Sequence, residues 1–174
     1  MATPVKFTID PLPTAVSQGN ANLRWLAATA VMDSYKAKKA VSMGEASARL
    51  GGEYVLKQAQ GVALKWNEVD AWLTAGGFNK EPQLCFGAEG WEKLLKEHGP
   101  LITLIDGSND AVAAIDHAVV VVGIDGDGTE GGTYISYADG QTATVESQTL
   151  STFATRFELP SGTNAVFSVG YFKP

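Results

Sequence analysis

The hydrophobic and polar positions of this 174-residue chain change their period about halfway along it. In the first half, apolar residues recur three and four positions apart, which is the spacing of one buried helix face. In the second half they form continuous β-branched and apolar runs, which are typical of strands covered on both faces. Helices followed by strands in this order predict an α+β fold.

Four helices are expected from the apolar spacing and from the residues at their ends. The expected spans are residues 23–38, residues 46–50, a segment between Asn67 and Gly76, and residues 89–97. Asn22 is expected to cap the first helix and Asn67 the third, because a short polar side chain can accept a hydrogen bond from a free backbone N–H. Ser42 and Glu45 have the spacing of a capping box, and Gly51-Gly52 is expected to end the second helix.

The second half predicts a sheet. The expected strands are residues 101–105, 117–124, 133–137 and 165–172. The acidic, glycine-rich segment 125–132 is interpreted as a hairpin loop between two of them. It lacks the spaced bidentate glutamate of an EF-hand, so no metal site is expected there, and nothing else in the sequence indicates a cofactor.

Composition limits the classes of protein to consider. A chain of 174 residues with 45% hydrophobic content is expected to form one domain over residues 1–174. Its net charge of -6 and isoelectric point near 4.8 offer no basic surface for a phosphate backbone, so nucleic acid is not an expected partner. The single cysteine, Cys85, cannot form a disulfide within the chain.

The N-terminal residues and the hydropathy indicate where the chain acts. MATPVKFTID has neither the charged start nor the apolar stretch of a secretory signal peptide, and no apolar run approaches the roughly 20 residues of a membrane span. The chain is therefore expected in the cytoplasm and not in a membrane. Export by a secretion system that needs no signal peptide stays open.

Three segments, in order, resemble the papain-like cysteine peptidases. The first is Gln18-Gly19 followed by Trp25, the second is the run that begins at His117-Ala118-Val119, and the third is Asp139-Gly140. The resemblance covers roughly residues 12–140 and is strongest to compact bacterial members, some of them secreted effectors. It implies a helical half packed on an antiparallel sheet or half-barrel.

The resemblance also implies a role for each residue. Gln18 would help to form the oxyanion hole, His117 would be the catalytic base, and Asp139 would orient that histidine. The nucleophilic cysteine would stand directly before Trp25, where this chain has Arg24. Because a guanidinium stays protonated and has no lone pair to donate, Arg24 cannot form an acyl intermediate.

The expected function is therefore that of an inactive peptidase homologue that binds a protein or peptide in the former substrate cleft, as an effector or a regulator. Two alternatives stay open. Cys85 could act as a relocated nucleophile in an active peptidase or amidase. Alternatively, the motifs could coincide by chance in an unrelated α+β protein, in which His117 would be a structural histidine.

Arg24 also conflicts with local electrostatics. It lies in the first turn of the expected helix, where a cation opposes the helix dipole by about 0.3–1 kcal/mol. A nearby anion would offset this cost. We therefore expect Arg24 to form an ion pair with Asp139, or with another acid near the cleft.

Overall fold

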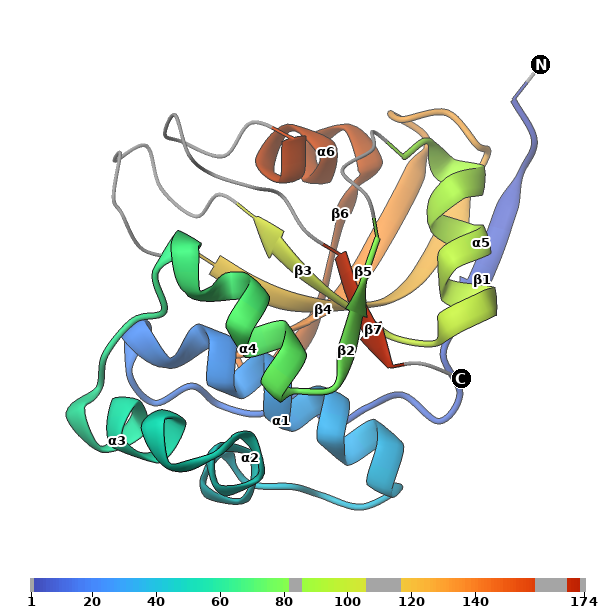
Figure 1. Ribbon diagram of the computed structural model, residues 1–174. Coiled ribbons are helices and arrows are strands. Elements are labelled where there is room, and N and C mark those ends of the chain that lie inside the picture. The colour runs from blue at the N-terminus through green and yellow to red at the C-terminus, as the bar shows by residue number, and fades with distance from the viewer. Residues whose placement is uncertain (1, 82–85, 106–116, 159–168, 173–174) are drawn as a thin grey trace.

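The apolar run that begins at His117 forms the central strand of the structure, β4 (His117–Gly126). Its first eight residues are all buried, because neighbouring strands flank it and helices cover it. The computed structural model describes residues 2–81, 86–105, 117–158 and 169–172. In these ranges the chain folds as predicted, with helices packed on an antiparallel sheet (Figure 1).

The sheet contains strands from both ends of the chain. The other strands are β1 (Val5–Thr8), β2 (Phe78–Lys80), β3 (Leu101–Ile105), β5 (Thr133–Asp139), β6 (Thr144–Thr149) and β7 (Val169–Phe172). Their order is β2-β7-β3-β4-β5-β6, with every pair antiparallel. The first half of β4 pairs with β3 and its second half with β1, so along β4 the strand β1 lies just beyond Leu101, the first residue of β3.

Helices cover the two faces of this sheet (Figure 1). They are α1 (Arg24–Ala37), α2 (Met43–Leu50), α3 (Gly52–Gln60), α4 (Val69–Ala75), α5 (Ala88–His98) and α6 (Leu150–Glu158). Helix α1 lies across β3, β4 and β5, and α2 packs on α1. On the opposite face, α5 and α6 meet through the ring of Trp91, which contacts Phe153 and Phe157 at centroid distances of 5.5 and 5.2 Å. The sheet core is therefore enclosed from both sides.

The start of the second helix follows the predicted capping box. Ser42 Oγ accepts a hydrogen bond from the Glu45 backbone N–H at 3.2 Å, and Glu45 Oε2 accepts one from the Ser42 N–H at 2.8 Å. The prediction that Gly51-Gly52 ends this helix after Leu50 is confirmed. Gly51 ends α2, but α3 begins at once at Gly52.

The two predicted asparagine caps are wrong. Asn20, not Asn22, accepts the capping hydrogen bond, and it caps a 3₁₀ turn (Ala21–Leu23) that precedes α1. Asn22 instead donates its side-chain N–H to the carbonyl of Gly61 at 2.9 Å. Asn67 lies inside a second 3₁₀ turn (Trp66–Glu68), which leads into α4. In both places the turn shifts the helix start by one or two residues.

Several elements lie where no element was predicted, namely β1, β2, β6, α3 and α6. The predicted closing strand 165–172 is confirmed over Val169–Phe172, which form β7, and residues 165–168 lie outside the described ranges. The hairpin at 125–132 is present, and Asp127 accepts hydrogen bonds from the backbone and hydroxyl of Thr129.

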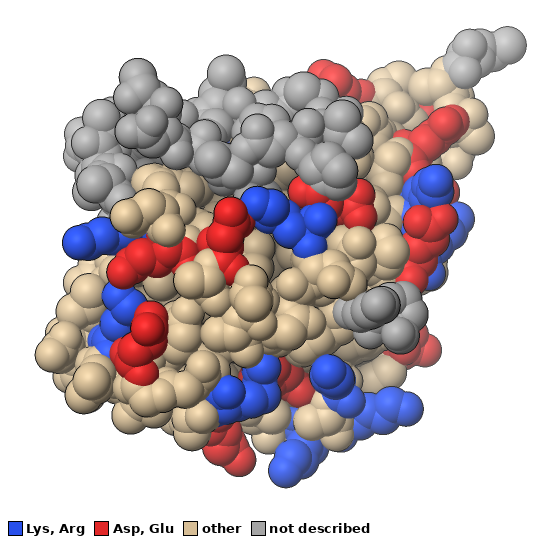
Figure 2. Space-filling model, in the orientation of Figure 1, with Lys and Arg blue, Asp and Glu red and all other residues tan. Residues whose placement is uncertain are grey.

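Charges of both signs are interspersed on the face shown in Figure 2, in keeping with a chain that has 13 basic and 19 acidic residues. Within the described ranges, no helix is both long and apolar enough to cross a membrane. The same ranges contain no cluster of three or more His, Cys, Asp or Glu side chains that could hold a metal ion.

Candidate functional site

His117 and Asp139 form a buried pair at one end of the sheet. His117 is the first residue of β4 and Asp139 the last of β5, and Asp139 lies opposite Val119 in the register. Side chains two apart on a strand share a face, so Asp139 comes beside His117. His117 Nε2 lies 2.8 Å from Asp139 Oδ2. The structure thus brings together two of the four residues singled out in the sequence.

The environment of Asp139 favours its ionised form. Burial by itself raises the pKa of this carboxyl, but the hydrogen bond and charge of His117, together with Gln141 and Arg156, outweigh burial, so the pKa is lowered. The backbone N–H of Gln141 donates to the other oxygen, Oδ1, at 2.7 Å, and the charge of Arg156 adds to the effect. Asp139 therefore holds the ring of His117 in a fixed orientation through Nε2.

We expect Asp139→Asn to make the fold less sensitive to acid. Because the pKa of Asp139 is lower in the folded than in the unfolded chain, its carboxylate stabilises the fold above about pH 4, and this stabilisation is lost as the pH falls below that. Urea midpoints measured from pH 6 to pH 3 should therefore fall less for the variant than for the natural chain. The exposed Asp125, changed to Asn, is the matched control and should follow the natural chain. Equal acid sensitivity of the Asp139 variant and the natural chain would contradict this assignment.

Gln18 lies against the residue that follows Asp139. Its backbone N–H donates to the Gly140 carbonyl at 2.8 Å, and its side chain is buried, with 7% of the residue exposed. A Cβ built on Gly140 would lie 3.4 Å from the Gln18 Cβ and 2.8 Å from the Ala27 Cβ. Gly140 is thus enclosed between the Gln18 segment and helix α1, where only a hydrogen atom fits in place of a side chain.

Arg24 is the first residue of α1 and comes one turn before Ala27 on the same face of that helix. The residue is partly buried, and its Nε is fully buried with no hydrogen-bond partner among the described residues. The expected ion pair with Asp139 is wrong. Asp139 is engaged by His117 and Gln141 instead, and none of the described carboxylates pairs with Arg24.

The start of α1 is held in place by the end of α3. Trp25 is 1% exposed, its Nε1 donates to the Val62 carbonyl at 3.3 Å, and its ring packs against Tyr54 and Trp72. Asn22 is held to the neighbouring Gly61 carbonyl. Arg24 lies between these two anchored residues, so its backbone has a fixed position even though its guanidinium Nε is unpaired.

The site therefore contains the hydrogen-bonded pair of His117 and Asp139, with Gln18 in contact with the next residue, Gly140, and Arg24 on the adjoining helix face. Sequence reasoning missed Gly140 as the contact between them, although it had noted the Asp139-Gly140 pair. It also missed Arg156, whose charge acts on Asp139 from the unpredicted helix α6. Cys85, the alternative nucleophile, lies outside the described residues.

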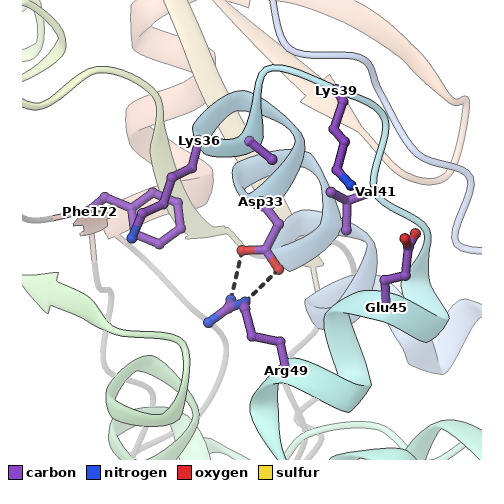
Figure 3. A pocket seen from close by; sticks show the side chains of 8 residues that line it. Asp33, Lys36, Lys39, Val41, Glu45, Arg49 and Phe172 are labelled. Atoms are coloured by element: carbon purple, nitrogen blue, oxygen red, sulfur yellow. Dashed lines mark hydrogen bonds and ion pairs between the residues drawn. The ribbon is translucent and has the colours of Figure 1, made fainter.

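A separate pocket of about 340 Å³ lies near the other end of α1 (Figure 3). Arg49 donates to both oxygens of the buried Asp33, at 2.8 and 2.7 Å, and to the Gly76 carbonyl at 3.0 Å. Burial raises the pKa of Asp33, and Arg49 opposes that rise. The charges at the floor of this pocket are thus used to hold α1, α2 and α4 together.

Comparison with known proteins gives one family. A family model described as papain-like cysteine protease AvrRpt2 matches residues 7–158, which include all four residues named above and most of the described elements. A search of curated proteins found no match.

Proposed function

This chain belongs to the papain-like cysteine protease AvrRpt2 family, and from that premise we propose that it binds a polypeptide without cleaving it. The observation that carries the proposal is Arg24. It is the first residue of α1, six positions after Gln18 and directly before Trp25, where the papain-like pattern has its cysteine.

The chemistry of the remaining residues supports binding. In a papain-like site, a thiolate attacks the scissile carbonyl, and the imidazole moves the proton. The pair of His117 and Asp139 is assembled for that proton transfer. A guanidinium at the nucleophile position has no electron pair to donate, so no covalent intermediate can form there.

The occupant that we propose is a protein or peptide lying along the former substrate groove. A chain that keeps the scaffold of a protease can still recognise extended polypeptides, because recognition and bond cleavage use different groups. We further propose that the chain acts in the cytoplasm or after export by a signal-independent secretion system, as an effector or as a regulator of another protein. Neither nucleic acid nor a membrane enters this proposal.

Two measurements on the natural chain test this function. A pool of acetylated octapeptides of randomised sequence should be retained by the immobilised chain and recovered intact, as judged by mass spectrometry. An electrophilic thiol probe should label the chain no faster after folding than after denaturation, because a thiol outside an activating site has an ordinary reactivity.

One outcome would overturn the binding function in favour of catalysis. It is rapid labelling of Cys85 in the folded chain that is lost in His117→Ala, together with peptides cut into shorter products. The histidine variant is the necessary comparison, because a relocated thiol would still depend on His117 for its deprotonation.

A further inference from the structure

Two polar side-chain atoms in the site are buried and unpaired among the described residues. They are Gln18 Oε1, which is a hydrogen-bond acceptor, and Arg24 Nε, which is a donor. Leaving such an atom buried without a partner destabilises the fold, and more so when the group is charged. Most buried polar groups in native proteins are paired, so these two call for a partner that the described residues do not supply.

The charges at the start of α1 indicate that this partner is an anion. The free N–H groups at the start of a helix carry a partial positive charge, and Arg24 adds a full one at its first residue. No acidic residue lies in the first turn of α1, and Asp139 is already bonded to His117 and Gln141. An anion is therefore favoured at this end of the helix. The planar donors of an arginine suit a carboxylate in particular.

The acceptor Gln18 Oε1 further restricts the chemistry of the ligand. Gly140 lies against Gln18 and against Ala27 of α1, and Arg24 precedes Ala27 by one turn, so the side chains of Gln18 and Arg24 extend from neighbouring parts of the site. In the last residue of a polypeptide, the carboxylate carbon and the backbone nitrogen are both bonded to the Cα. The anion and an N–H donor therefore lie side by side. In an acidic side chain the carboxylate lies one or two bonds further from the backbone N–H of its residue, and a phosphate ion has no N–H.

We propose that this site binds the C-terminal carboxylate of a polypeptide. The guanidinium of Arg24 receives the carboxylate, and Gln18 Oε1 accepts a hydrogen bond from the N–H of the terminal residue. The proposal rests on the proposed binding function, since it places the end of the bound chain where a substrate carbonyl would meet the nucleophile. Arg24 then favours a carboxylate, whose carbon bears two oxygens, over the carbonyl of a peptide bond.

The experiment compares two pools of acetylated octapeptides of the same randomised composition, one with free C-terminal carboxylates and one with C-terminal amides. Both are offered together to the immobilised full chain, and the retained peptides are counted by mass spectrometry. We expect the free carboxylates to be retained at least about tenfold better, which corresponds to one charge-assisted hydrogen-bonded contact.

Variants of one residue identify the contact. Arg24→Gln should abolish the preference for the free carboxylate, and Arg24→Lys should keep only part of it, because lysine retains the charge without the planar pair of donors. Lys36→Gln is the matched control, since it removes the same charge from the last turn of the same helix and should keep the preference. Arg24 has no partner to lose among the described residues, so its variants should unfold at the same temperature as the natural chain or higher.

Each remaining outcome has its own meaning. Equal retention of both pools would overturn the carboxylate assignment while the binding function stands. Retention of amidated peptides enriched in Asp or Glu would assign the site to acidic side chains and would also overturn it. Retention of neither pool would overturn the binding function and this proposal together. A preference that survives in Arg24→Gln would show that the carboxylate is bound elsewhere.

Discussion

Arg24→Cys, made in a chain whose own Cys85 is changed to Ala, is expected to give a thiol that an electrophilic probe labels rapidly in the folded state. The start of α1 would favour the thiolate through the helix dipole, and His117 would accept its proton. A helix N-terminus and a neighbouring imidazolium both lower the pKa of a cysteine. Labelling should therefore proceed at neutral pH, where an ordinary thiol reacts slowly.

The histidine makes this result specific. Adding His117→Ala to the same chain should slow labelling by about a hundredfold, the lower end of what a positioned base contributes. Denaturing the single-cysteine chain should slow it as well, because the activation comes from the fold. Equal labelling with and without His117 would mean that the sulfur and the imidazole do not meet, and that residue 24 does not occupy the nucleophile position.

The sequence predicted the centre of the fold well because burial there is nearly complete. The strand Leu101–Ile105 was predicted with the bounds that it has, since all five residues are buried and a loop could not satisfy such an apolar run. The capping box of α2 was also predicted correctly. Its signal lies within four residues and does not depend on tertiary contacts.

The elements that were missed depend on contacts that a local pattern does not contain. Strand β6 has no fully buried residue and is held mainly by its backbone pairing with β5. Helix α3 begins directly after Gly51, where a pair of glycines predicts an end and not a start. Helix α6 is different, because Leu150, Phe153 and Phe157 already have helical spacing that the prediction overlooked; Phe153 and Phe157 pack on Trp91 of α5.

Of the site, the sequence predicted that His117 and Asp139 lie together, but not which other groups pair with them. The order of the strands was enough to place His117 beside Asp139, because both lie at ends of neighbouring strands. Opposite charge suggested that Arg24 would pair with Asp139. Charge alone, however, does not tell which of several donors forms the hydrogen bonds to a carboxylate. His117, the Gln141 N–H and the charge of Arg156 all act on Asp139, and only the last two come from outside the motifs.

Gly140→Ala is expected to destabilise the fold by about 2 kcal/mol, within the range that overpacking usually costs. The added methyl would lie 2.8 Å from the Ala27 Cβ and 3.2 Å from the Val16 carbonyl oxygen. Neither atom belongs to a flexible side chain, so either α1 or the Gln18 segment must move. Urea unfolding at neutral pH measures the loss. Gly131→Ala, where a Cβ meets nothing within 4 Å, is the control and should change stability by no more than about 0.5 kcal/mol.

A second substitution tells whether the contact with α1 is the cause. Ala27→Gly removes the nearest atom but costs about 1 kcal/mol by itself, because glycine weakens a helix. If the two residues collide as the distances indicate, the double variant should be more stable than the sum of the two single effects predicts. Simple additivity would place the strain at Val16 or Gln18 instead. Gly140 joins Asp139 to both Gln18 and α1. That result would therefore also show whether the Gln18 segment or helix α1 moves when a methyl group is added at Gly140.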